Sequence, residues 1–332
     1  MTDPTFGAKN IPALVAALNM RLTEDARGQL IGASTVAPRF ELYHAGFSIC
    51  SNKVRCVLSE KRIPFTSHAM QIGPVEGRVQ DNYLPEYLRL RMLGQPDASY
   101  VGGYSGASSM ATEGFDPAVV PTLIDHAKER VVVDSRAICL YLDQEDGEGP
   151  RLNPPDIAGD ISAQIDLIDR APHVALLYGA HPDNDTRPQP LIDTITGIHA
   201  RKIAGLAEVL KDVADEPALV RAYAHKIAKE SAAASFVADG AKLRDVHAEF
   251  DSHVAALEAQ LKASEGPWVF GERYTLADIM WTTSLFRLRL LGLQTLWAGG
   301  TERPMVSDYI KTGMARPSFG EAVLEWHPKA RS

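Results

Sequence analysis

Residues 39–61 read RFELYHAGFSICSNKVRCVLSEK and contain a strand, a short loop and a helix. The segment Arg39–His44 alternates apolar and polar side chains, which is typical of a strand. In Ser51–Lys61 the apolar residues recur at helical spacing, and Ile63–Met70 predicts another strand. A strand, a helix and a strand in this order form a βαβ unit, which implies a right-handed crossover and two parallel strands.

A helix and then a long polar segment follow this unit. Residues Asn82–Leu93 predict the helix. The segment Ser99–Gly114, SYVGGYSGASSMATEG, is rich in glycine and small polar residues. We expect it to form an exposed loop, because such residues supply little material for a core. This segment is called the insert below.

A hairpin and a capped helix come next. The runs Val119–Asp125 and Arg130–Val133 flank a turn and predict two antiparallel strands. Pro121 should lie at a strand start or edge, because proline lacks a backbone donor. Asp134-Ser135 then opens the helix Arg136–Asp143, where an acidic or hydroxyl residue suits the N-terminus. The predicted order is therefore β-α-β-α-β-β-α, an α/β arrangement.

An acidic linker rich in glycine and proline, Asp143–Pro155, ends this part of the chain, and the remainder predicts helices. The clearest helix start is a capping box formed by Thr275 and Asp278. The helix that follows, Leu276–Leu291, is apolar on nearly all sides, so we expect it to lie buried at the centre of its domain.

The sequence thus predicts three parts. An N-terminal arm over residues 1–38 carries one short helix, Pro12–Leu22. An α/β domain covers residues 39–145, and an all-helical domain covers residues 156–330.

The composition of the 332-residue chain limits the classes of function. A net charge of −8 lacks the basic character of a nucleic-acid-binding protein and disfavours anionic membranes. No apolar run is long enough to span a bilayer, and the N-terminus lacks a signal pattern. The three cysteines, an odd and low number, suit a reducing compartment and have no zinc-ligand spacing. We expect a cytoplasmic protein with no metal, no nucleic-acid partner and no membrane association.

The order of elements and three local motifs resemble the cytosolic glutathione transferases. Val120-Pro121 resembles the Val-cis-Pro of that family, Asp134-Ser135 its acidic-serine pair, and Tyr274–Asp278 the capping box of its core helix. The resemblance covers residues 40–330 and implies a thioredoxin-like domain followed by an all-α domain. It also implies glutathione as co-substrate, a small aromatic second substrate, and a dimer of identical or different subunits.

Two further segments narrow this resemblance. Phe47–Lys53, FSICSNK, and Ala277–Thr282, ADIMWT, resemble the bacterial reductive dehalogenases of tetrachlorohydroquinone and 2,5-dichlorohydroquinone. The bacterial β-aryl etherases of lignin breakdown are also similar. The arm and the insert depart from the ordinary family pattern.

Cys50 is the candidate catalytic thiol. It stands at the start of the helix Ser51–Lys61, where free N–H groups, the helix dipole and nearby basic residues favour a thiolate. The alternative is a small buried thiol without a task, which fits Cys56 and Cys139. On the resemblance, Cys50 attacks the sulfur of a glutathionyl-hydroquinone, releases the reduced aromatic and forms a disulfide that a second glutathione clears.

Three neighbours of Cys50 are further candidates. Ser51 or Asn52 could steady the glutathione thiolate, as a hydroxyl or amide at this turn does in the ether-cleaving relatives, and capping of the helix is the alternative. Lys53 is a candidate partner for the glycyl carboxylate of glutathione, and a solvated lysine is the alternative.

Two dipeptides are candidates for the remaining glutathione contacts. A cis bond between Val120 and Pro121 would leave backbone groups free to pair with glutathione, and an ordinary edge-strand proline is the alternative. Ser135 and the helix N-terminus suit the γ-glutamyl carboxylate, and Asp134 suits its ammonium group. A plain pair of capping residues is the alternative.

The pocket for the second substrate is expected between the two domains, with aromatic walls and a few donors around a planar phenolic ring. The candidate residues are His44, Phe47, His173, Tyr178 and Trp281. Positions in the core are the alternative for most of them, and a structural role is commoner for any single histidine.

Three functions remain open from the sequence. The leading one is reductive dechlorination of a chlorinated hydroquinone in bacterial aromatic degradation, with two glutathiones used per chloride. The next is β-aryl ether cleavage, in which the glutathione thiolate displaces phenoxide at carbon and no enzyme thiol is required. The last is non-catalytic binding of an aromatic ligand or a partner protein by the same fold.

Overall fold

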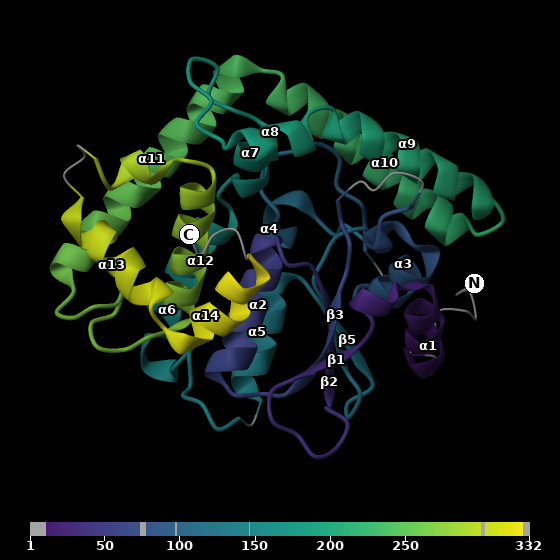
Figure 1. Cartoon of the computed structure of the whole chain (residues 1–332), viewed down its shortest axis with the longest axis horizontal. Helices are drawn as coiled ribbons and strands as arrows, with labels where there is room; N and C mark the ends of the chain where they lie inside the picture. The colour runs from purple at the N-terminus through teal and green to yellow at the C-terminus, as the bar shows by residue number, and fades with distance from the viewer. Residues whose placement is uncertain (1–10, 74–77, 97, 146, 300–302, 328–332) are drawn as a thin grey trace.

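The computed structural model describes residues 11–73, 78–96, 98–145, 147–299 and 303–327. Figure 1 shows a central sheet, with helices α2 and α5 between it and a large helical part, and helices α1 and α3 on its other side. Residues 1–10 of the predicted arm and residues 328–330 of the predicted all-helical domain lie outside the described residues.

The sheet has five strands in the order β1-β3-β2-β4-β5. Their bounds are β1 Gln29–Ile31, β2 Phe40–His44, β3 Phe65–Ala69, β4 Thr122–Asp125 and β5 Arg130–Val133. Strands β2 and β3 pair in parallel, with Leu42 opposite Ser67, and β4 runs antiparallel to both β2 and β5. With α2, α3 and α5 in sequence, the predicted β-α-β-α-β-β-α order is confirmed.

Helices cover both faces of this sheet (Figure 1). Those on one side are α2 (Ile49–Glu60) and α5 (Ser135–Gln144), and those on the other are α1 (Ile11–Arg21) and α3 (Pro85–Met92). The arm is an integral part of the core, because Leu18 of α1 is fully buried in a cluster with Tyr43 and Tyr87. Burying such side chains supplies the free energy that fixes the arm to the sheet.

The arm also supplies strand β1, which pairs antiparallel with β3. The sequence did not predict this strand. Its three residues, QLI, are too few to display an alternation of apolar and polar side chains.

The remainder of the chain is helical, as predicted. The bounds are α6 Ala158–Asp169, α7 His173–Tyr178, α8 Gln189–Ile195, α9 Ile198–Asp212, α10 Pro217–Val237, α11 Gly240–Ala263, α12 Leu276–Leu290, α13 Pro304–Met314 and α14 Pro317–Ala322. None of the helices in the described ranges has the length and apolarity required to cross a membrane.

Helix α12 lies at the centre of this helical part, as its sequence predicted. Every residue from Leu276 to Leu288 is buried. The capping box is present, and the Thr275 N–H donates to Asp278 Oδ2 at 2.8 Å.

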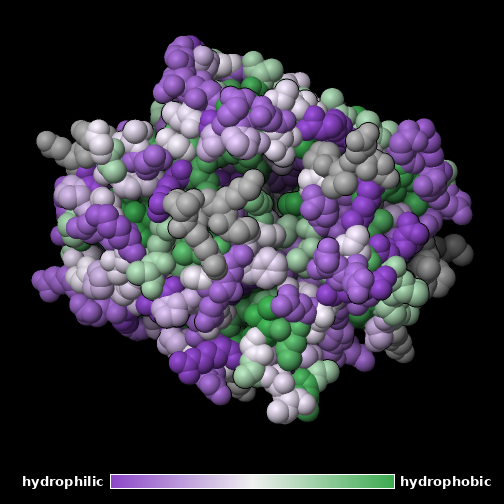
Figure 2. All heavy atoms as spheres, viewed as in Figure 1, coloured by the Kyte–Doolittle hydropathy of each residue, from purple (hydrophilic) through white to green (hydrophobic). Residues whose placement is uncertain are grey.

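Figure 2 shows that the face of the molecule turned to the viewer is largely hydrophilic, with hydrophobic residues gathered near its centre and lower edge.

The insert is more ordered and more buried than its composition suggests. It contains a short helix, α4 (Met110–Glu113), and the expectation of an exposed loop is wrong for Gly106, Ala107, Ser109 and Glu113, all of which are buried. The small residues permit a close approach, since a Cβ on Gly106 would lie 2.5 Å from Ala175 Cβ. Small side chains thus bring the backbone against α7 instead of leaving it in solvent.

Candidate active site

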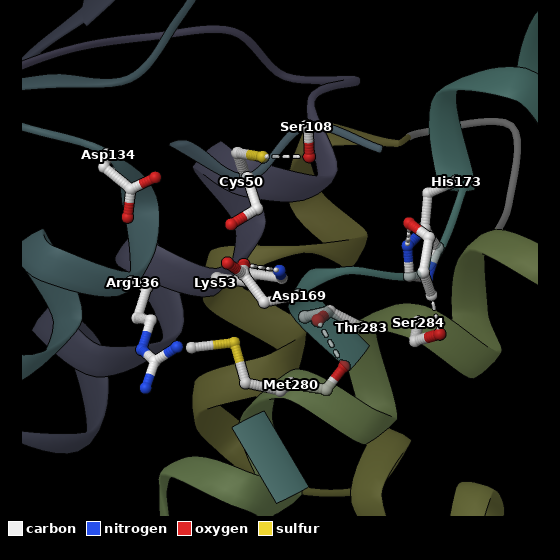
Figure 3. A network of polar contacts seen from close by, with 12 residues as sticks. Cys50, Lys53, Ser108, Asp134, Arg136, Asp169, His173, Met280, Thr283 and Ser284 are labelled. Atoms are coloured by element: carbon white, nitrogen blue, oxygen red, sulfur yellow. Dashed lines mark hydrogen bonds and ion pairs between the residues drawn. The ribbon is translucent and has the colours of Figure 1, made fainter. Parts of the chain in front are cut away.

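Cys50 lies in the first turn of α2, because the helix begins two residues earlier than predicted. Ser48 is the N-cap, and its hydroxyl accepts from the Ser51 N–H at 3.2 Å. The N–H groups of this turn have no partner within the helix, so they stabilise negative charge nearby. Cys50 Sγ lies 3.2 Å from Ser108 Oγ of the insert, and Figure 3 shows the two groups facing each other.

One turn later Lys53 forms a buried ion pair with Asp169 of α6. Lys53 Nζ lies 3.2 Å from Asp169 Oδ1, and the two residues are 2% and 4% exposed. Burial alone would lower the pKa of Lys53, but Asp169 and the nearby Cys50 thiol raise it above its ordinary value. Lys53 is therefore a permanent buried cation beside Cys50 and not a solvated lysine.

Ser51 and Asn52 direct their polar atoms into the protein. Ser51 is fully buried, and its hydroxyl accepts from the Ala45 N–H at 3.2 Å. Asn52 is 2% exposed, and its Oδ1 accepts from Arg55 at 2.5 Å. The Ser51 hydroxyl thereby holds the loop that leads into α2, and the Asn52 amide holds the Arg55 side chain.

The Val120–Pro121 peptide bond is cis, as predicted. The carbonyl of Pro121 accepts from Arg91 at 2.5 Å, which fixes the start of β4. The N–H and C=O of Val120 make no hydrogen bond to any described residue. They are the backbone groups expected to be free for glutathione.

Asp134 and Ser135 stand at the N-terminus of α5. Asp134 has φ +73°, a left-handed conformation that is costly for a residue other than glycine and concentrates at functional sites. Its Oδ1 accepts from the Ala137 N–H and its Oδ2 from the Met110 N–H of the insert, both at 3.1 Å. Ser135 is 5% exposed, and its hydroxyl has no hydrogen-bond partner among the described residues.

The chemical character of these groups matches that of the groups of glutathione. A helix N-terminus with the free Ser135 hydroxyl suits a carboxylate, and the Asp134 carboxylate suits an ammonium group. The unpaired backbone of Val120 suits a peptide unit.

Two of the five candidate pocket residues retain accessible surface. Phe47 is 58% exposed, and its ring packs edge-on against His327, with centroids 4.5 Å apart. Tyr178 is half-buried, and its hydroxyl accepts from Lys202 Nζ at 3.1 Å. The Tyr178 hydroxyl therefore keeps its own hydrogen available for donation.

The other three candidates are core residues. His44 Nε2 lies 2.8 Å from Ser67 Oγ, and Trp281 Nε1 donates to Gln164 Oε1 at 2.8 Å. His173 Nε2 lies 2.7 Å from Ser284 Oγ, and burial lowers the pKa of His173 to about 3. Its imidazole is neutral at physiological pH and serves the packing of α7 on α12 (Figure 3).

Three residues beside Cys50 were not identified from the sequence: Ser108, Asp169 and Arg287. Arg287 of α12 is 5% exposed and donates to the Phe47 carbonyl. Burial lowers its pKa, while the Tyr178 phenol and the Cys50 thiol nearby oppose that shift. The arginine within the apolar run of α12 could have been identified as a candidate from the sequence. A charged side chain is rarely buried unless it has a partner or a function.

The two other cysteines lie in a different environment. Cys56 and Cys139 are at most 1% exposed, and burial raises the pKa of Cys56 to about 12 and that of Cys139 well above its ordinary value. They are neutral buried thiols, as the sequence suggested.

Comparison with known proteins identifies the family. The glutathione S-transferase N-terminal domain model matches residues 47–145, and the C-terminal domain model matches residues 228–312. The chain is 44% identical over 303 residues to a 2,5-dichlorohydroquinone reductive dechlorinase of Sphingobium indicum, covering 90% of this chain and 87% of the relative. It is 28% identical over 294 residues to a tetrachloro-p-hydroquinone reductive dehalogenase of Sphingobium chlorophenolicum, covering 86% of this chain and 96% of the relative.

A solved structure shows the same fold. The β-etherase LigF of Sphingobium sp. strain SYK-6 superposes with a TM-score of 0.52 at 16% identity, covering 86% of this chain and 98% of the other. The two domain models and the 44% identical relative lead to one conclusion. The chain belongs to the glutathione S-transferase family.

Proposed function

We propose that this enzyme removes chloride reductively from a chlorinated hydroquinone with glutathione as the reductant. The observation that carries the proposal is the Cys50 sulfur, which lies in the first turn of α2 beside the buried Lys53 cation. Reactive cysteines of enzymes are commonly found at helix N-termini and near cationic side chains. The similarity to the Sphingobium indicum dechlorinase supports this choice of substrate class.

The proposed reaction balances in three steps. A glutathione thiolate forms a bond to the chlorinated carbon, and chloride leaves with the electron pair. The Cys50 thiolate then attacks the glutathionyl sulfur, and the electron pair of the broken carbon–sulfur bond stays on the ring carbon, which takes up a proton. A second glutathione thiolate attacks the Cys50–glutathione disulfide, which releases oxidised glutathione and restores the Cys50 thiolate. The aromatic ring gains two electrons, which two glutathiones lose.

The proposal assigns each group a task. Ser135 and Asp134 hold the γ-glutamyl end of glutathione, and the backbone of Val120 pairs with its peptide unit. Phe47 forms one wall for the aromatic substrate. Tyr178 and Arg287 donate to its phenolic oxygens, since both have donors to spare.

The experiment that tests this function compares the wild type with Cys50→Ser. With a chlorohydroquinone and glutathione, the variant should still form the glutathionyl-hydroquinone. It should release the dechlorinated hydroquinone at least about a hundredfold more slowly. Release at the normal rate contradicts the proposal. Cleavage of a β-aryl ether that does not depend on Cys50 would indicate an etherase, and glutathione binding without turnover would indicate a binding protein.

We also propose that the chain works in the cytoplasm as a dimer, with an arm over residues 1–38, a glutathione domain over residues 39–145 and a substrate domain over residues 156–330. The family resemblance supports the dimer. Sedimentation equilibrium should give twice the mass of the 36.1 kDa chain, and a monomer mass at micromolar concentration would contradict it.

A further inference from the structure

The insert contacts the proposed glutathione site at two points. Ser108 Oγ lies 3.2 Å from Cys50 Sγ, and the Met110 N–H donates to Asp134 Oδ2 at 3.1 Å. Cys50 is the reacting sulfur, and Asp134 is the proposed partner of the γ-glutamyl ammonium. A single short segment thus contacts both ends of the site, and Figure 3 shows its contact with Cys50 through Ser108.

The insert is also fixed to the helical part of the molecule. The carbonyl of Gly106 accepts from the N–H groups of Val174 and Ala175, at 2.9 and 3.1 Å, at the start of α7. Glu113 accepts from the Ser105 N–H at 2.6 Å and pairs with Lys229 Nζ of α10 at 3.1 Å. These contacts hold the backbone on either side of Ser108 in one position, so its hydroxyl remains directed at the sulfur.

We propose that the insert is a fixed wall of the glutathione site and that Ser108 is a positioning residue for the Cys50 sulfur. The proposal rests on the proposed function, in which Cys50 reacts twice. The Ser108 hydroxyl donates a hydrogen bond to the Cys50 thiolate. This bond holds Cys50 Sγ in one rotamer, directed toward the glutathionyl sulfur. When the second glutathione attacks the mixed disulfide, Cys50 is the leaving group, and the same hydroxyl receives the returning negative charge.

The test uses three single substitutions in the full-length enzyme. Ser108→Ala removes the hydroxyl, Ser108→Thr keeps it, and Ser99→Ala is the matched control at an exposed serine of the same insert. Supplied with a preformed glutathionyl-hydroquinone in a single turnover, Ser108→Ala should release the hydroquinone roughly threefold to tenfold more slowly, the value of one hydrogen bond. Ser108→Thr should recover most of the rate, and Ser99→Ala should equal the wild type.

A second measurement needs no substrate. Iodoacetamide should alkylate Cys50 selectively, because Cys50 is 9% exposed whereas Cys56 and Cys139 are at most 1% exposed. We expect Ser108→Ala to slow this alkylation at pH 7 by a similar factor. Peptide mapping identifies the modified cysteine.

The outcomes separate the two proposals. Unchanged rates of both reactions in Ser108→Ala overturn the role of Ser108, as does a Ser108→Thr variant as slow as Ser108→Ala. If the wild type shows no reductive step that depends on Cys50 while alkylation still depends on Ser108, the proposed function is wrong and the positioning role stands.

Discussion

Cys50 differs from Cys56 and Cys139 in what surrounds its sulfur. The latter two are packed among apolar side chains, where burial keeps a thiol neutral. Cys50 has a helix N-terminus, a hydroxyl and a buried ammonium group as neighbours. The three thiols therefore have different neighbours, although they lie in the same domain.

The Lys53–Asp169 pair gives a prediction for stability. Replacing Lys53 by Met leaves the Asp169 carboxylate buried without its counter-ion, and we expect a loss of about 3 kcal/mol in the free energy of unfolding. Denaturant titration measures this loss. The double variant Lys53→Met with Asp169→Leu should recover most of it, because it removes both charges. A double variant as unstable as Lys53→Met would mean that the pair is not the cause.

Arg287 gives a prediction for substrate binding. Replacing it by Met removes donors proposed for the phenolic oxygens, so KM for the aromatic substrate should rise roughly tenfold, with KM for glutathione unchanged. Steady-state kinetics with each substrate varied in turn measures both values. Equal increases in the two KM values would indicate that Arg287 only supports the loop through Phe47.

The sequence singled out Cys50 as the candidate thiol but did not identify the side chains that surround it. Cys50 was recognisable because strand, loop and helix follow each other locally. Ser108 lies 58 residues from Cys50 in the sequence, and Asp169 lies 116 residues from Lys53. No local pattern couples such positions. The burial of His173 and Trp281 could not be predicted from the sequence either, because pockets and cores contain the same residue types.

At the level of elements, strand β2 is joined to the β4–β5 turn by a carboxylate and a histidine. Glu41 of β2 is 6% exposed, and its Oε2 lies 2.7 Å from His126 Nε2. The hydrogen bond to Glu41 raises the pKa of His126, with burial opposing and the Coulomb attraction of Glu41 and Asp125 assisting. The charged imidazole is thus favoured in the folded state.

This contact predicts a dependence of stability on pH. A group whose pKa is raised by folding stabilises the protein fully below its unfolded value of about 6.5, and this contribution is lost as the pH rises through the folded value. His126→Ala should therefore destabilise the protein more at about pH 6 than at about pH 9. Urea titrations of both proteins at the two pH values measure the difference, and an equal effect at both would contradict it.

The elements themselves were largely predictable. The strands β2 to β5 and the helices α2, α5 and α12 follow from periodicity and caps, which are local signals. The short strand β1 and the packing of the insert were not, because each depends on a partner distant in sequence. Gly106 illustrates the limit, since its smallness suggested a loop but serves a close approach to α7.

On the scale of the whole molecule, the two parts are joined by shared hydrophobic clusters. A single cluster joins Leu42, Val57 and Leu142 of the α/β part to Ile165, Trp281 and Phe286 of the helical part. Opening the boundary between them would expose this cluster to water. We expect thermal unfolding in one cooperative transition, with the calorimetric and van't Hoff enthalpies equal in scanning calorimetry. Two resolved transitions would show that the parts unfold independently.

The central claim is that the Cys50 thiolate takes glutathione from the aromatic ring. Mass spectrometry of the intact enzyme tests it most directly, on a sample quenched with acid after a single turnover of glutathionyl-hydroquinone without free glutathione. The account predicts one glutathione bound as a disulfide, located by peptide mapping on Cys50 and released by a reductant. Formation of the hydroquinone with all three cysteines unmodified would contradict it.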